Sequence, residues 1–550
     1  MQYPTLLEYM KAIQDAGVNL DKLSHLSVVL DGQGEPYHIS GDSSVVFKMQ
    51  DKTTGKCYAL KCFTKAQKGC ADASSNSSSV KFLEKELLVL SQGKEEKYPV
   101  ELMDWVDGDS LGASQLKVED MSTEATKAEL NEAITDEFGV KYSKDGRKLL
   151  KVPQKLKGTY AIKEGTKIIC DRAFEDCKSL RSLVIPNSVT SIGESAFSFC
   201  SSLKSIVLPD GITSIGDETF FGCSSLASLV IPDGVTSIGN GAFAYCGSLK
   251  NLVLPESVVS IKGNLFCKWN GEVKCLSPNF IFEDGVLFNK GKSTIISFRD
   301  KDITSYVIPD YVTSIGGDAF SGCESLTSLV IPDSVVSIGG GAFSHCESLK
   351  NIVLPNSITS IGFCVFQHCR SLKSLVIPDG VTSIGSGAFS GCESLKSIVI
   401  PDSVTCIGNR AFEYCFSLKS LVLSKSLTSI GDWAFNMAES LESLVIPDSV
   451  TSIGDYAFSG CRSLKSLVIS NSVTHIAVGA FLSCTSLSSV VIPDGVTSIG
   501  EGAFIGCESL KSIVLPDGVV SIEKDAFRDC NFPNDFKQKL ISRFGDKIFG

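Results

Sequence analysis

The stretch AFSGCESLKSIVIPDSVTCIGNR, from Ala388 to Arg410, is one turn of a repeat that fills most of this 550-residue chain. Self-similarity at a fixed step of 20 to 50 residues predicts a solenoid, a propeller or an array. A step of 23 residues is too short for a helical pair or a propeller blade, which need about 33 or more. The repeated phenylalanine falls in two series, Phe174, Phe197, Phe220, Phe243 and Phe266, then Phe320, Phe343, Phe366, Phe389, Phe412, Phe435, Phe458, Phe481, Phe504 and Phe527.

Each part of the unit predicts a local structure. Leu-x-x-Leu-x-Ile alternates with the period of a strand, and the following Pro ends that strand because it has no N–H to donate. Asp-Gly or Asp-Ser then makes a corner, and Val-x-x-Ile-Gly forms a second short strand. Ala-Phe-x-x-Cys is expected to cross to the next coil as a helical or 3₁₀ turn. No coil buries its own apolar residues, so the coils must stack.

These residues carry a family resemblance. IPDSVTSIGDYAFSGCRSLKSLVI, from Ile446 to Ile469, closely resembles the BspA-type, or TpLRR, leucine-rich repeats of surface proteins from anaerobic bacteria and some protists. The resemblance covers about residues 170–530. It implies a β-rich solenoid of leucine-rich repeats, a cell-surface or secreted location, and adhesion to host proteins or other cells.

Composition and charge exclude some classes of function. Hydrophobic residues make up 43% of the chain, enough for a large buried core. The formal net charge is −11, and no basic stripe is interleaved with aromatic residues. These features argue against a nucleic-acid binder and against electrostatic docking on anionic lipid.

The 21 cysteines suggest a disulfide framework until their positions are compared. Thirteen lie three residues after the repeat phenylalanine, and Trp269 and Ala438 take that place in the two remaining coils. We therefore expect buried thiols that act as small apolar groups, with a disulfide or metal ladder as the alternative. The thirteen are Cys177, Cys200, Cys223, Cys246, Cys323, Cys346, Cys369, Cys392, Cys415, Cys461, Cys484, Cys507 and Cys530.

The predicted location follows from the thiols and from the first residues. An odd cysteine total is typical of a reducing compartment. MQYPTLLEYMKAIQDAGVNLDKL is predicted to be a short amphipathic helix, because it lacks the basic and apolar regions of a secretory signal. These observations favour the cytoplasm, whereas the family resemblance favours the cell surface, so the sequence leaves the location open.

The first 116 residues differ from the repeats. Gly41 to Phe63 resembles the first three strands of a protein kinase, with strands over Val45–Met49 and Tyr58–Phe63. The resemblance makes Lys61 the candidate phosphate-binding lysine and implies a helix over Val80–Leu90. Its ion-pair partner on that helix would be Glu84 or, second, Glu86. Leu102 to Leu111 resembles the fifth strand and hinge.

The kinase resemblance fails where chemistry would occur. Of the three glycine-loop positions, Ile39, Gly41 and Ser44, only one holds glycine, and no His-Arg-Asp or Asp-Phe-Gly follows residue 111. Phosphoryl transfer needs a positioned base and metal-binding carboxylates. We therefore expect no enzyme activity and no required cofactor. Lys61 and Glu84 remain candidates only for nucleotide binding, the alternative being an ordinary structural or docking domain.

Two hairpins and a terminal helix interrupt the pattern. FGVKYSKDGRKLLKVP, residues 138–153, turns at Asp145-Gly146 and resembles residues 281–297 between the two phenylalanine series. Phe536, Leu540 and Phe544 share one face of a predicted C-terminal helix that would cap the solenoid. The predicted division is a kinase-lobe-like domain at 1–116, a linker at 117–136, a hairpin cap with the first array at 137–268, a hairpin module at 269–306, the second array at 307–530 and a helical cap at 531–550.

Two repeated positions invite metal-site hypotheses. His345-Cys346 and His368-Cys369 occupy the same positions in neighbouring coils, about 5 Å apart by strand spacing. They could form a two-His, two-Cys cluster, but Phe199, Tyr245 and Tyr414 elsewhere in this position favour packing. An Asp after Pro could form a calcium ladder, but it is ordinary in a turn. These aspartates are Asp210, Asp233, Asp310, Asp333, Asp379, Asp402, Asp448, Asp494 and Asp517.

The strongest functional signal is a valine between the two inward strand residues. Its neighbours point inward, so this valine is predicted to point outward and to form a continuous apolar stripe. High strand propensity is the competing explanation. The positions are Val184, Val207, Val230, Val253, Val307, Val330, Val353, Val376, Val399, Val422, Val445, Val468, Val491 and Val514.

The sequence therefore supports two hypotheses. The favoured one is a non-enzymatic scaffold or adhesin that binds proteins or peptides through the valine face, and such a uniform surface could also bind its own kind. The other is a nucleotide-responsive regulator or degenerate, inactive kinase that uses Lys61 and Glu84. We assign no catalytic or metal-binding residue.

Overall fold

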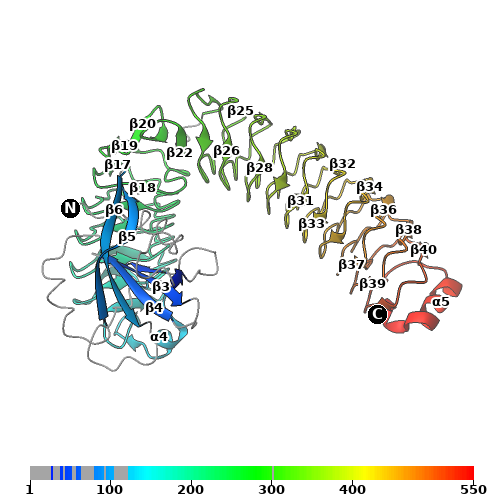
Figure 1. Cartoon of the computed structure of the whole chain (residues 1–550), viewed down its shortest axis with the longest axis horizontal. Coiled ribbons are helices and arrows are strands. Elements are labelled where there is room, and N and C mark those ends of the chain that lie inside the picture. The colour runs from blue at the N-terminus through cyan, green and yellow to red at the C-terminus, as the bar shows by residue number, and fades with distance from the viewer. Residues whose placement is uncertain are drawn as a thin grey trace. The chain divides into compact units, whose positions relative to one another are not determined.

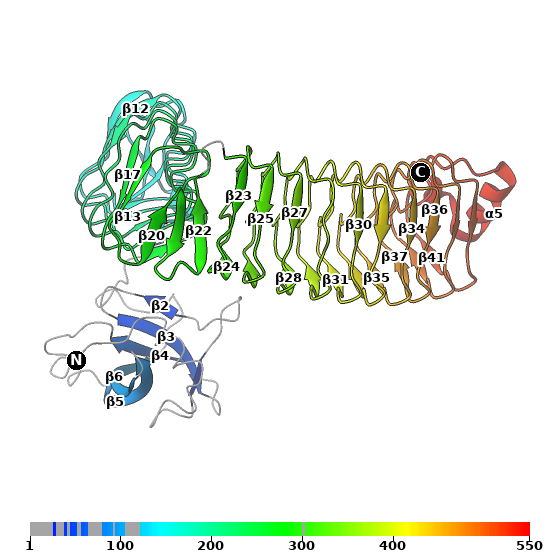
Figure 2. The same cartoon turned by 90° about the horizontal axis from the view of Figure 1, so that it is seen from above.

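The computed structural model describes residues 26–28, 38–40, 44–51, 57–63, 80–91, 94–104, 122–299 and 303–550. The chain divides into two compact units, residues 1–120 and residues 121–550. Each unit is described by itself below. Figures 1 and 2 show both units in two perpendicular views.

The first unit contains an antiparallel sheet with the strand order β1-β3-β4-β6-β5, and β2 pairs with β3. Both predicted strands are present, as β3 and β4, and they pair from Ser44 opposite Phe63 to Gln50 opposite Cys57. The strands are β1 (Leu26–Val28), β2 (His38–Ser40), β3 (Ser44–Asp51), β4 (Cys57–Phe63), β5 (Val80–Ser91) and β6 (Lys94–Asp104).

The helix predicted over Val80–Leu90 is wrong, because this segment is strand β5. It pairs with β6 down to Ser91 opposite Lys94, so only two residues connect the strands, and the second of them is Gly93. A two-residue connection with glycine strongly favours a hairpin. β5 pairs with β6 on both sides of Glu84-Lys85-Glu86, where the register shifts between Leu83 and Leu87. Strand pairing of the flanking residues therefore overrides the helical propensity of the segment.

The second unit is a solenoid with two parallel β-ladders. In most paired strands of the first ladder the partners lie 23 residues apart, as when Ser397 lies opposite Ser420. In Figure 2 its strands β25, β27, β30, β34 and β36 follow one another along the solenoid. The strands are β10 (Gly158–Ala161), β12 (Leu180–Val184), β14 (Ser205–Ile206), β17 (Asn251–Leu254), β19 (Glu272–Cys275), β23 (Ser305–Val307), β25 (Ser328–Val330), β27 (Asn351–Val353), β30 (Ser397–Val399), β32 (Ser420–Val422), β34 (Ser443–Val445), β36 (Ser466–Val468), β38 (Ser489–Val491) and β40 (Ser512–Val514).

The second ladder uses the predicted Val-x-x-Ile-Gly segment and two antiparallel hairpins. Its Ile points into the core, and the residues before it face outward. Its strands are β7 (Ile134–Thr135), β8 (Lys141–Tyr142), β9 (Lys148–Lys151), β11 (Ile168–Ile169), β13 (Ser191–Ile192), β15 (Ser214–Ile215), β16 (Ser237–Ile238), β18 (Ser260–Ile261), β20 (Phe280–Glu283), β21 (Val286–Asn289), β22 (Thr294–Phe298), β24 (Ser314–Ile315), β26 (Ser337–Ile338), β28 (Ser360–Ile361), β29 (Ser383–Ile384), β31 (Cys406–Ile407), β33 (Ser429–Ile430), β35 (Ser452–Ile453), β37 (His475–Ile476), β39 (Ser498–Ile499) and β41 (Ser521–Ile522).

The Ala-Phe-x-x-Cys segments form the third side of each coil. The Cys N–H bonds to the Phe carbonyl three residues earlier, as from Cys392 to Phe389, which is the hydrogen bond of a 3₁₀ turn. The residue before the Cys has a positive φ, for example 74° at Gly391, so the turn cannot continue as a helix. Inside the coils the phenylalanine rings stack, with Phe389 5.0 Å from Phe412 between ring centroids.

The interrupting module separates two hydrophobic cores. Along β21 the side chains alternate between them: Val286 and Phe288 pack in the core of the second array, and Leu287 packs in that of the first. The phenylalanine stack of the second array begins within the module, where Phe298 lies 4.7 Å from Phe320. One strand therefore serves as a wall for both arrays.

The far end is closed by helix α5 (Asn534–Phe544) and the short 3₁₀ helix η2 (Asp546–Phe549). Leu540 and Ile548 are buried against the last coil. The N–H groups of Asp525 and Phe527 donate to the carbonyls of Lys547 and Ile548. In earlier coils the corresponding N–H groups donate to the next coil, so the 3₁₀ helix takes the place of a further coil. Within residues 122–550 as described, a further helix, α4 (Lys127–Asn131), precedes the solenoid. Among the described residues no helix is long and apolar enough to span a membrane.

Candidate interaction surface

The valine stripe, defined as the fourteen valines of the first ladder, faces solvent as predicted. The exposed fraction of its members runs from 42% at Val253 to 80% at Val376. The residues on either side are buried, as Leu375 and Ile377 are on either side of Val376. The alternation of the strand therefore leaves one apolar column outside while it fills the core with the other.

A hydroxyl column runs beside the stripe. Two residues before each valine stands Ser or Asn, as Ser397 and Ser420 do, and these side chains share the outward face of the sheet. Small polar side chains leave the larger valines prominent, so the sheet face presents an apolar ridge beside a low polar strip.

Charged rows border this face along the second array. The basic row lies three residues before the valine and the acidic row three residues after it, and the charged members of both rows are exposed. The basic row is Thr304, Thr327, Lys350, Lys373, Lys396, Lys419, Glu442, Lys465, Ser488 and Lys511. The acidic row is Asp310, Asp333, Asn356, Asp379, Asp402, Lys425, Asp448, Asn471, Asp494 and Asp517. Across the width of the sheet the charge therefore changes from positive to negative.

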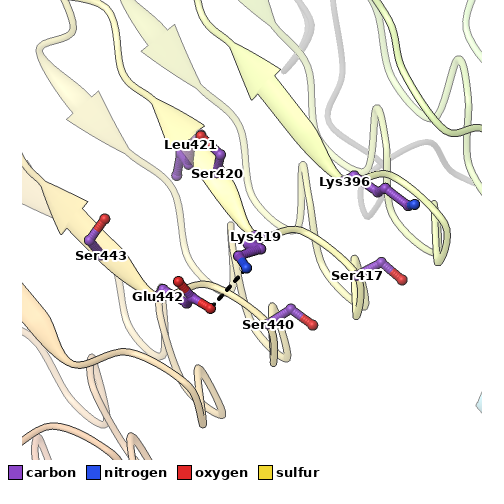
Figure 3. A pocket seen from close by; sticks show the side chains of 8 residues that line it. All are labelled: Lys396, Ser417, Lys419, Ser420, Leu421, Ser440, Glu442 and Ser443. Atoms are coloured by element: carbon purple, nitrogen blue, oxygen red, sulfur yellow. Dashed lines mark ion pairs between the residues drawn. The ribbon is translucent and has the colours of Figure 1, made fainter.

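A shallow hollow lies on the basic border of the face, with a volume of about 590 Å³. Figure 3 shows Lys396, Lys419 and Glu442 in a row across it, with the Lys419 Nζ and Glu442 Oε1 atoms 3.2 Å apart. Leu421 and four serines, Ser417, Ser420, Ser440 and Ser443, complete the lining. The hollow offers hydroxyl groups and charges at the edge of the apolar stripe, which suits the polar rim of a protein interface.

The cysteine column does more than fill space. Most of its thiols point at the carbonyl of the phenylalanine 26 residues earlier, as Cys415 Sγ does at 3.3 Å from the Phe389 oxygen. Eleven cysteines of the column make this contact, at 3.1 to 3.6 Å. Burial raises the pKa of Cys415 to about 12, so the thiol keeps its proton and can donate it. A sequence reading that treats these thiols as apolar groups misses this bond between coils.

The paired histidines lie at the surface. The rings of His345 and His368 are 4.7 Å apart, and both residues have positive φ. His368 lies over Gly391, where a Cβ atom would be 2.4 Å from the His368 Nδ1 atom. Cys346 and Cys369 are fully buried. The described residues contain no group of three or more His, Cys, Asp or Glu that could hold a metal ion.

The nucleotide candidates lie on different strands of the first unit. Lys61 is in β4, where it pairs with Val46 of β3 and Glu101 of β6. Glu84 is in β5, and β6 lies between β4 and β5. The backbone therefore does not place the two residues on neighbouring strands or put Glu84 on a helix. Of the other kinase-like segments, Gly41 and residues 105–111 lie outside the described residues.

The comparisons with known proteins concern the solenoid. A family model described as a BspA type leucine rich repeat region matches residues 158–272, 295–419 and 405–534. No curated protein matches the chain.

Several solved structures are similar to the chain. A leucine-rich repeat protein from Eubacterium ventriosum shares 28% identity, with 55% of this chain and 82% of that chain covered and a TM-score of 0.46. One from Bacteroides ovatus shares 28%, with 76% and 97% covered and a TM-score of 0.39. A leucine rich cell surface protein from Faecalibacterium prausnitzii shares 30%, with 53% and 94% covered and a TM-score of 0.37.

Proposed function

The chain belongs to the BspA-type leucine-rich repeat family, and from that premise we propose that it is a non-enzymatic scaffold that binds protein partners through the valine stripe. Leucine-rich-repeat solenoids are typically binding scaffolds that offer long, regular surfaces. In the adhesive version of this proposal, the partner is a protein on another cell or on a host surface.

One observation carries the proposal: the outward position of the first ladder holds valine in fourteen coils, and Ala161 and Lys274 stand there only in the strands at the two ends of the first array. Strand propensity does not account for this, because threonine is also β-branched and favours strands. Threonine does occur on the same coils, one residue before the second-ladder strands, where its hydroxyl donates to a carbonyl of the preceding coil, as from Thr382 to Thr359, but it does not occur in the stripe. A water-facing column that excludes threonine is retained for its apolar surface, and large exposed apolar patches mark interaction sites.

The test replaces part of the stripe and keeps the fold. In the variant Val376→Thr, Val399→Thr and Val422→Thr, the full chain should melt as the wild type does, because the positions face water. Capture of partner proteins from a lysate should fall strongly. Unchanged capture by this variant would show that the first ladder is not the interaction surface.

A further inference from the structure

We propose that the face of the second array that carries the valine stripe binds a second copy of this chain, with the basic row of each copy against the acidic row of the other. This inference rests on the proposed function, because it names the partner of the same surface. Ten valines, from Val307 to Val514, run along this face between the two charged rows.

The arrangement of charge selects one symmetry. Two copies can meet face to face through a two-fold axis that runs parallel to the strands or along the solenoid. An axis parallel to the strands would put basic row against basic row. An axis along the solenoid puts each basic row against the acidic row of the other copy and valine against valine. Closed two-fold contacts of this kind use one self-complementary patch.

The spacing of the rows also fits a second copy. Parallel strands repeat at about 4.8 Å, so charges one coil apart on each copy recur at the same interval. A partner with another repeat would drift out of step within a few coils. The face of ten coils, about seven residues wide, covers on the order of 1,000 Å² per copy, above the roughly 800 Å² per partner of a standard stable interface.

Two exchanged charges fix the register. Glu442 is the one acid in the basic row, and Lys425 is the one base in the acidic row. Stacked sheets cross at about 30°, which displaces the facing borders by roughly one coil. With this displacement Glu442 faces Lys425, and no like charges meet. The pairs opposed near the crossing point are Lys396 with Asp379, Lys419 with Asp402, Glu442 with Lys425, and Lys465 with Asp448; farther along the solenoid the crossing carries the rows apart.

Without the displacement the pattern fails at the same two residues. Lys419 would face Lys425, and Glu442 would face Asp448. Within one chain each exchanged residue has only an exposed ion-pair partner. Glu442 pairs with Lys419 of its own row, and the Lys425 Nζ atom lies 3.9 Å from Asp402 Oδ2 of its own row. Exposed pairs of this kind add little to stability. Most of the other charges, including Lys396, form no ion pair within the described residues.

The test is charge exchange in the full chain, followed by sedimentation equilibrium at micromolar concentration. The acidic variant carries Lys396→Glu, Lys465→Glu and Lys511→Glu, and the basic variant carries Asp379→Lys, Asp448→Lys and Asp494→Lys. The wild type should be a dimer. Each variant alone should be a monomer with an unchanged melting curve, because its borders repel. A mixture of the two should form a heterodimer, because every reversed pair is then complementary.

Three outcomes would overturn the self-association. These are a monomeric wild type, variants that dimerise alone, and a mixture that stays monomeric although both variants fold. None of them touches the broader proposed function, which fails separately if the Val376, Val399 and Val422 variant still captures its protein partners. Weakening of the dimer by added salt is a further expected result, because the borders are exposed charges.

Discussion

The two ladders of the solenoid share one inward plan and differ in their outward residues. Both bury a branched aliphatic residue at each step, as Leu375 of the first ladder and Ile384 of the second show. Outside, the first ladder presents valine, while the second presents mainly threonine and serine. The core explains what the ladders have in common. Threonine beside the second ladder is explained by its hydroxyl, which donates to the carbonyl of the threonine one coil earlier, as from Thr428 to Thr405, whereas the valines of the first ladder have no such bond to make.

The exceptions strengthen this comparison. Valine replaces threonine on the second ladder at Val259, Val336 and Val520, and all three are exposed. The second ladder thus tolerates valine, yet the first has not exchanged valine for threonine in any coil. The two faces lie on the same coils, so differences in stacking or coil length cannot cause the contrast.

The largest expected effect comes from opening the core on either ladder. Leu375→Ala and Ile384→Ala each leave a cavity and should lower the free energy of unfolding by about 2–5 kcal/mol. The outward change Val376→Thr should stay within about 0.5 kcal/mol. Thr382→Val should cost about 0.5–1.5 kcal/mol, because it removes the hydrogen bond from the Thr382 hydroxyl to the Thr359 carbonyl. Denaturant titration measures all four. If Val376→Thr proved as costly as Leu375→Ala, the column would point inward, and the comparison of the two faces would fail.

Alkaline pH should destabilise the third side of the coils, which the Ala-Phe-x-x-Cys segments form. Burial raises the pKa of Cys415 and of Cys461 to about 12, whereas an unfolded thiol titrates near 8.5. The folded state then holds protons that the unfolded state loses. The stabilisation is complete below about pH 8.5 and is lost as the pH rises toward 12. Cys415→Ala, which copies Ala438 of the next coil, should show a shallower loss, and an identical slope would contradict this account.

A smaller effect is expected for the reactivity of Cys406, which lies on the second ladder, compared with the thirteen repeat cysteines on the third side of the coils. Cys406 replaces serine on the second ladder and is exposed, whereas the thirteen repeat cysteines are buried. Cys406 is therefore expected to be the first of the described cysteines to react with a thiol reagent, and Cys406→Ser should remove that phase. Unfolded protein should react at about 21 sites. Rapid labelling of a dozen or more in native protein would show that the third side of the coils is open.

The smallest expected effect lies outside the solenoid. Lys61→Met should leave the melting curve and partner capture unchanged, because neither ladder depends on the first unit's candidate lysine. Addition of Mg-ATP should not raise the melting temperature of either protein. A stabilisation by Mg-ATP that disappears in Lys61→Met would favour the nucleotide-responsive alternative.

The repeat itself made most of the fold predictable. The 23-residue step, the alternation around Val376 and the Pro after each strand place both ladders and the stripe. These signals recur coil after coil, so a local ambiguity in one coil is resolved by the others. The N-terminal unit offers no such repetition, and there a helical composition over Val80–Leu90 competed with strand pairing that only the folded sheet supplies.

Other features depended on contacts between coils. A bond from Cys415 to the Phe389 carbonyl joins residues 26 apart, and spacing alone does not show which atom a thiol faces. The sequence also does not reveal the positive φ of His345 and His368. The position before the repeat cysteine has a positive φ in every coil but holds glycine in some coils and larger residues in others. The charged borders were visible as turn residues, but their places on either side of one face required the structure.

The most direct test exchanges the outward residues of the two ladders over three coils. The variant carries Val376→Thr, Val399→Thr and Val422→Thr together with Thr382→Val, Thr405→Val and Thr428→Val, so composition and exposed apolar area are conserved. Sedimentation equilibrium of the full chain, with melting as the control for folding, is the measurement. We predict a monomer, because the moved valines lack the charged borders. It should stay folded and melt at a slightly lower temperature, because three threonine hydroxyl bonds between coils are lost. A variant that associates as tightly as the wild type would contradict the assignment of binding to the valine stripe.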